Sequence, residues 1–163
     1  MSTTASAHPT IPQGLDSRLL KEGYGPGAWH GPDLKAALAD VPAAVAFWRP
    51  ATDRHNIAEI ALHHAYCVRN VRAKISGEPA EPFVLDGDDW FPVPDANTLS
   101  WAAIQTTVET EQRRLSSLVA DVDAGRAKSP LTMIEQFDVV LGIACHAIYH
   151  AGQVQLIKRL AGE

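Results

Sequence analysis

Residues 139–157 read VVLGIACHAIYHAGQVQLI and contain no Asp, Glu, Lys or Arg. The length and composition of this run predict a buried helix. His146 and His150 stand four residues apart within it. Because positions i and i+4 lie on the same face of a helix, both imidazoles can face one ion. In so apolar a setting the ring nitrogens need partners, and a bound cation supplies one. The run therefore predicts a metal site on a core helix.

Length and charge limit the classes of protein to which the chain can belong. Its 163 residues suit one hydrophobic core, so we expect a flexible tail over residues 1–14 and a single domain over residues 15–163. The formal net charge of −5, without a basic cluster, argues against nucleic acid and membrane as partners. The tail has no secretory signal and the two cysteines form no disulfide framework. We therefore expect a cytoplasmic protein.

Helical periodicity predicts an all-α protein, a four-helix bundle. The first helix is broken by the loop GPGAWHGP, and the expected ranges are 15–24 with 33–49, about 55–76, about 97–123 and about 130–160. A proline-rich segment over residues 77–97 is long enough to cross over from the second helix to the third and to cover a site. The short link before the last helix predicts that the third and fourth helices are antiparallel neighbours.

The last predicted helix is apolar on more than one face. A helix in a bundle of four normally keeps one face in water. The excess apolar surface therefore predicts a partner subunit, and we expect a homodimer.

A third ligand has to come from another helix, because zinc and similar ions usually take three or four protein ligands. The second predicted helix offers His63 and His64. On a helical wheel His64 lies at the centre of the apolar stripe, whereas His63 lies roughly 100° away, nearer Glu59. Periodicity alone favours His64.

Two segments resemble motifs of the DinB/YfiT superfamily. Residues 56–63, NIAEIALH, are similar to its second-helix motif, in which a Glu precedes the first metal-binding His by four residues. Residues 146–153, HAIYHAGQ, resemble its last-helix motif, and WHGP at 29–32 and the Asp89–Trp90 loop are weaker likenesses. The resemblance implies a four-helix bundle, often dimeric, that holds a divalent ion through one histidine of the second helix and two of the fourth.

Carried over residue by residue, the resemblance implies that the metal ligands are His63, His146 and His150. Candidates for the surrounding residues are Gln153, His64 and Glu59. His64 stands where the family usually has an aliphatic residue, so it is either a core histidine or a group behind the ligands. Three imidazoles leave a coordination position open, as catalytic sites do.

The resemblance also implies an activity. Characterised members include S-transferases and a maleylpyruvate isomerase that use mycothiol, bacillithiol or glutathione. We therefore expect an enzyme that joins a low-molecular-weight thiol to a small electrophile, or a related hydrolase. The alternative is a non-catalytic, metal-binding, stress-associated homodimer. All-imidazole sites suit zinc, nickel, copper and iron alike.

Cysteines and tryptophans leave further alternatives open. Cys67 and Cys145 lie near the predicted ligands in sequence, and each is either a fourth ligand, a redox thiol or a packing residue. A fourth protein ligand, such as Cys67 or His64, indicates a closed structural site. The four tryptophans either pack in the core or line a substrate pocket.

Overall fold

Helices form the fold over residues 11–162, which are the residues that the computed structural model describes. The elements are α1 (Leu15–Tyr24), α2 (Leu34–Leu38), α3 (Ala43–Ala46), α4 (Ile57–Ser76), α5 (Trp101–Asp123) and α6 (Met133–Leu160). The predicted all-α class is confirmed. Residues 1–10, which make up most of the predicted tail, lie outside the described residues, as does Glu163.

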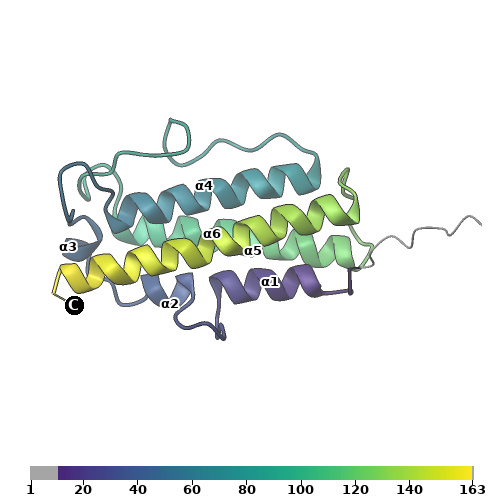
Figure 1. The fold of residues 1–163 in the computed structure, drawn as a ribbon. Helices are drawn as coiled ribbons and strands as arrows, with labels where there is room; N and C mark the ends of the chain where they lie inside the picture. Colours follow the sequence, from purple (N-terminus) through teal and green to yellow (C-terminus); the bar gives the residue numbers. More distant parts are fainter. Residues whose placement is uncertain (1–10, 163) are drawn as a thin grey trace, which may run out of the picture.

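Four of the helices pack around a shared core (Figure 1). The helix α4 packs on α5 and α6, and α1 packs on the same two. Figure 1 shows α4 and α5 running in one direction and α1 and α6 in the other, with the segment between α4 and α5 returning along α4. The third and fourth predicted helices, α5 and α6, are antiparallel as expected. They are not the main neighbours of each other, however, because α5 packs on α4 and α1. The long segment allows this because it returns the chain to the end at which α4 began.

The first predicted region is more broken than the sequence pattern suggested. The helix α1 has the expected limits, but residues 33–49 form two short helices rather than one. Asp33 begins α2 as predicted, with its carboxylate accepting a hydrogen bond from the Ala36 amide at 2.8 Å. Asp40 adopts a left-handed conformation with φ 54°, and Pro42 then stands at the start of α3.

Capping side chains set the limits of the long helices. For α4 the prediction holds, since Asn56 caps its start and Gly77, with φ 75°, ends it. The helices α5 and α6 each begin about three residues later than predicted. Ser100 caps α5, and Thr132 with Glu135 forms a reciprocal capping box at the start of α6. These caps give the first backbone amides of α5 and α6 a hydrogen-bond partner. Asn97 and Pro130, where the sequence predicts the two helices to begin, do not.

The helix α6 is the only helix among residues 11–162 that is long and apolar enough to cross a membrane. It is, however, a core helix, because it packs on α1, α2 and α4. Its remaining surface keeps seven large apolar side chains exposed: Met133, Ile134, Leu141, Ile148, Tyr149, Leu156 and Leu160.

Candidate metal centre

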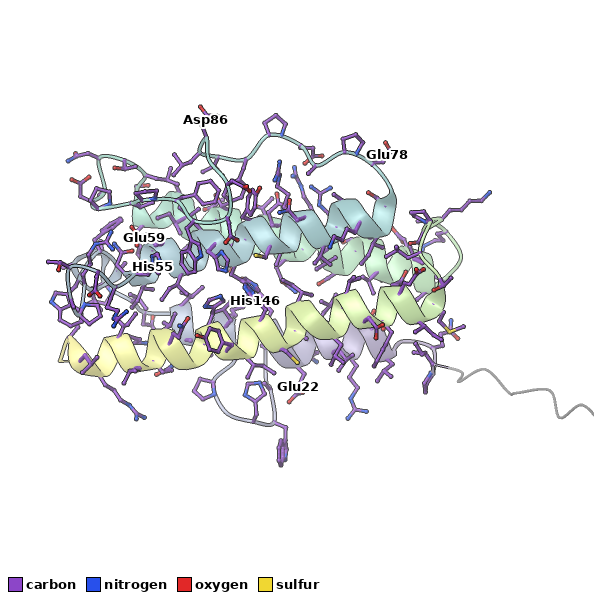
Figure 2. All side chains as sticks on the ribbon, turned by 45° about the horizontal axis from the view of Figure 1, so that its top comes forward. Glu22, His55, Glu59, Glu78, Asp86 and His146 are labelled. Atoms are coloured by element: carbon purple, nitrogen blue, oxygen red, sulfur yellow. The ribbon has the colours of Figure 1, made fainter. Side chains whose placement is uncertain are left out.

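Three imidazoles from two helices meet in the space between α4 and α6. His63 lies on α4, and His146 and His150 lie on α6. The Nε2 atom of His146 is 3.0 Å from Nε2 of His63 and 3.1 Å from Nε2 of His150. Figure 2 shows the His146 ring between the two helices. The structure thus brings together the three residues that the sequence motifs selected.

Oxygen atoms outside this cluster orient two of the rings. His63 Nδ1 lies 3.0 Å from the backbone oxygen of Asp89, and His150 Nδ1 lies 2.6 Å from Oε1 of Gln153. These oxygens only accept hydrogen bonds, so each Nδ1 donates its proton. The Nε2 atoms of His63 and His150 then carry free electron pairs in the neutral rings. Gln153 in turn donates to the Tyr149 hydroxyl at 3.1 Å, which fixes its amide.

His64 supplies the corresponding partner for the third ring. Its Nδ1 lies 3.1 Å from Nδ1 of His146, and its side chain is fully buried. When His146 donates this proton to His64, all three Nε2 atoms of the cluster are free to bind a cation. The Nε2 atom of His64 then carries a proton for which residues 11–162 provide no acceptor. His64 is therefore both a core residue, as the helical wheel indicated, and a group behind a candidate ligand.

Burial keeps these rings neutral, which is the form that binds metals. It lowers the pKa of His146 to about 4, with help from the neighbouring His150 and His63 rings. It lowers the pKa of His64 well below the usual range for the same reasons. Burial also lowers the pKa of His150, although the hydrogen bond that His150 donates to Gln153 partly opposes this.

The donor set fits a divalent transition metal. Nitrogens that share an ion at a metal–nitrogen distance of about 2.1 Å, with a right angle between the bonds, lie about 3 Å apart. The two Nε2 separations from His146, 3.0 and 3.1 Å, match this spacing. Free electron pairs at such separations repel one another, and a cation among them removes the repulsion.

Cys67 approaches the same centre from α4. Its sulfur lies 4.0 Å from Nε2 of His63, and Cys67, His63 and His146 offer ligand atoms that all lie within 4.8 Å of one another. Burial, with a smaller effect of Asp89, raises the pKa of the Cys67 thiol to about 11. The thiol is therefore protonated at neutral pH, whereas the three imidazoles have free electron pairs. Cys145 is exposed and takes no part in the cluster.

Glu59 does not contact the ligand rings, and its role is to hold the surrounding residues. Its buried carboxylate accepts a two-point ion pair from Arg49, a hydrogen bond from His55 at 3.0 Å and one from the Val93 amide at 3.0 Å. Burial alone would raise the pKa of Glu59, but the hydrogen bonds from Arg49, His55 and Val93 lower it overall. The carboxylate therefore ties α4 to the segments before and after it.

An aromatic stack connects Glu59 and its partner His55 with the histidine cluster. The Trp90 indole lies between His55 and His63, with ring centroids 3.7 and 4.0 Å away and nearly parallel planes. Asp89 precedes it with a left-handed φ of 63°, an uncommon conformation for a residue other than glycine. Trp90 and the backbone of Asp89 thus fix the His63 ring by its face and by its Nδ1. The predicted cover over the site comes from this part of the α4–α5 segment.

A cleft of about 450 Å³ opens beside His150. Its volume is within the range of small-molecule sites. The wall includes Trp90, Tyr149 and Leu156 as apolar surfaces and Gln153 as a polar group. Basic side chains at Arg54 and His55 also line it, and Asp53 is the acidic group at its edge. A ligand in this cleft lies next to the imidazole cluster.

The tryptophans divide between the two predicted roles, with two exceptions. Trp101 is a core residue whose indole donates to the Val41 carbonyl at 2.8 Å, and Trp90 lines the cleft. Trp29, at 94% exposure, and Trp48, at 37%, belong neither to the core nor to this cleft, so the prediction is wrong for both. The backbone of Trp29 is held outside the bundle by a hydrogen bond from its amide to Glu22.

Two side chains of the site escaped the sequence patterns. His55 lies before the start of α4, where it forms the outer layer of the stack and bonds Glu59. Tyr149 lies in the cleft and bonds Gln153. The i,i+4 spacing of Tyr149 and Gln153 in α6 was available in the sequence as a signal that these two side chains share a helix face.

Comparison with known proteins gives one match. Searches of curated proteins and of solved structures found no similar chain. Comparison with protein families matches residues 28–154 to the DinB superfamily, a span that includes the histidine cluster and the segment above it. The match covers most of the 163 residues, and the chain therefore belongs to the DinB superfamily.

Proposed function

We propose that the chain is a metal-dependent enzyme that joins a low-molecular-weight thiol to a small electrophile. The observation that carries this proposal is the cluster of three imidazoles, with Nε2 atoms 3.0 and 3.1 Å apart, beside a cleft of about 450 Å³. His63, His146 and His150 would hold the ion. A divalent ion held there supplies Lewis acidity, which lowers the pKa of a bound water or thiol.

The residues of the chain divide the remaining tasks. Asp89 and Gln153 orient two ligand rings through their Nδ1 protons. Trp90, Tyr149 and Leu156 provide an apolar wall for the electrophile. Arg54 lies at the same cleft, where its guanidinium suits a carboxylate on either substrate.

Metal-loaded protein tests this activity directly. The purified chain is loaded in turn with zinc, nickel, copper and iron, and the loss of free thiol is followed with a small electrophile that keeps the thiol as a stable adduct. His150→Ala is expected to lose metal and thiol consumption together, whereas His30→Ala, an exposed histidine outside the cluster, is expected to keep both. Metal retention with no turnover of any thiol would count against the enzyme.

A non-catalytic metal-binding protein is the second candidate, and Cys67 is the observation that favours it. With His63 and His146, Cys67 offers a set of ligand atoms within 4.8 Å. Added to His150, it would be a fourth protein ligand and would close the centre. This role requires that Cys67→Ala lose the metal, whereas the enzyme proposal requires that this variant keep it.

We also propose that two copies pair through α6 in the cytoplasm. The exposed apolar side chains of α6, which include Leu156 at 59% and Leu160 at 57%, support the pairing. The two free cysteines are consistent with a reducing compartment. Light scattering should give the mass of a dimer, and Leu156→Glu should reduce it to that of one chain.

A further inference from the structure

A second cavity lies at the end of the bundle where α1 begins and α5 ends (Figure 1). Its volume is about 380 Å³. The polar side chains on its wall include Asp16 from the first turn of α1, Asp123 at the end of α5, Ser129 and Gln136. Asp16 lies outside the residues that match the DinB superfamily, so membership does not account for this cavity.

Two carboxylate oxygens in this cavity are buried without a partner. Asp16 is 5% exposed, and its Oδ2 accepts a hydrogen bond from Gln136 at 2.9 Å, but its Oδ1 accepts none from residues 11–162. Oδ2 of Asp123 is equally buried and unpartnered within that range. No Lys, Arg or His of the described chain lines the cavity or pairs with either carboxylate. Buried charge is normally paired, so the arrangement calls for a cation.

The positions of the two residues in their helices concentrate negative charge. Asp16 stands in the first turn of α1, where the helix dipole favours a carboxylate. Asp123 stands in the last turn of α5, where the dipole disfavours one. Burial raises the pKa of Asp123, and Asp16 raises it further, against a smaller opposing effect of Ser17. A positive group in the cavity would relieve both the burial and the repulsion.

The walls of the cavity indicate the kind of cation. Calcium takes six to eight oxygen ligands, and magnesium takes six, whereas the cavity also has apolar walls at Val122, Leu131 and Met133. An ammonium group has three donors, which suit the free oxygens of Asp16 and Asp123 and the Ser129 hydroxyl. We propose that this cavity binds a small alkylammonium ion, with its charge held by Asp16 and Asp123 and its alkyl part against the apolar wall.

Titration of the full chain with butylammonium chloride tests the proposal, with potassium chloride at equal ionic strength as the reference. Calorimetry should show saturable binding of one ion per chain, and Tm should rise by several degrees at high ligand concentration. Butylammonium should bind about fourfold more tightly for each methylene that it has beyond methylammonium. Pentanoate, which has the same butyl group and a negative charge, should not bind.

Variants of three aspartates complete the experiment. Asp16→Asn and Asp123→Asn should each lose at least tenfold in affinity for butylammonium. Asp121→Asn, a half-buried aspartate of the same last turn of α5 that pairs with Arg126, and His146→Ala should bind as the parent chain does. Three results would each overturn the proposal. They are the absence of saturable binding, affinities of Asp16→Asn and Asp123→Asn for butylammonium equal to that of the parent chain, and tighter binding of calcium or magnesium than of butylammonium.

Discussion

The histidine centre and the carboxylate cavity bury polar groups in one helical bundle, but they satisfy them differently. In the centre, His63 and His150 have an oxygen acceptor for Nδ1, which leaves Nε2 free on the inside. In the cavity, Asp16 and Asp123 each keep a buried oxygen without a partner in the part of the chain that the structure describes. The first region holds neutral donors that a transition metal prefers, and the second holds negative charge that an organic cation prefers. Buried polar groups thus indicate a ligand by their charge and by what orients them.

The comparison is tested most strongly by removing a histidine. His146→Ala should reduce bound metal from about one ion per chain to background, since two imidazoles rarely hold such an ion. Asp123→Asn should leave the metal content unchanged, because it lies at the other region. Elemental analysis of both proteins after equal loading measures the difference. Equal metal in the parent chain and in His146→Ala would show that the ligand assignment is wrong.

The next largest effect is expected from Glu59, the buried carboxylate beside the histidine centre. Glu59→Gln replaces a buried carboxylate that holds Arg49, His55 and the Val93 amide. Breaking such a buried pair should lower the free energy of unfolding by about 3 kcal/mol. Urea denaturation of the metal-free proteins measures this, with Glu78→Gln, which is exposed, as the control. A change in the free energy of unfolding below about 0.5 kcal/mol would mean that Glu59 does not stabilise the fold.

A smaller effect is expected from the orienting groups. Gln153→Ala removes the acceptor of the His150 Nδ1 proton while leaving all three rings in place. Loss of such a partner usually weakens metal binding by about 10–100-fold. Competition with a chelator measures the affinity, and Gln155→Ala on the same helix is the control. An unchanged affinity would indicate that packing alone orients the ring.

Acid should affect the two regions in opposite directions. In the metal-free chain the folded pKa of His146, about 4, is below its ordinary value of 6.5, so the unfolded state binds protons more readily. Stability is therefore lost as the pH falls from about 6.5 to about 4. For Asp123, whose folded pKa is raised, acid favours the folded state. Urea denaturation across this range gives the slope of the free energy of unfolding against pH. This slope should be flatter in His146→Gln and steeper in Asp123→Asn than in the parent chain. The same slope in all three proteins would contradict the account.

How far the sequence predicts each region depends on the kind of pattern. The spacing of His146 and His150 marks a shared helix face, and Asn56 and Gly77 mark the limits of α4, because these are local rules. The choice between His63 and His64 depends on a neighbouring helix, and local periodicity pointed to the ring that lies behind the ligands. Asp16 and Asp123 look like ordinary residues of helix ends. Only the packing of α1 beside the end of α5 brings them to one cavity.

The position of the long segment was beyond local rules for the same reason. Its prolines predict an irregular crossover, and the structure has one. That Asp89 and Trp90 would lie on His63 depends on Glu59 holding the Val93 amide, a contact between residues far apart in sequence. Pairwise spacing within a helix carries no information about such contacts.

The central claim is that His63, His146 and His150 bind one ion through their Nε2 atoms. A crystal structure of the metal-loaded chain, with anomalous scattering recorded at the absorption edge of the metal, tests it most directly. We predict a single peak about 2.0–2.2 Å from the three Nε2 atoms, with Nδ1 of His150 still bonded to Gln153. A peak bound by Cys67 in place of His150, or no peak between α4 and α6, would contradict the account.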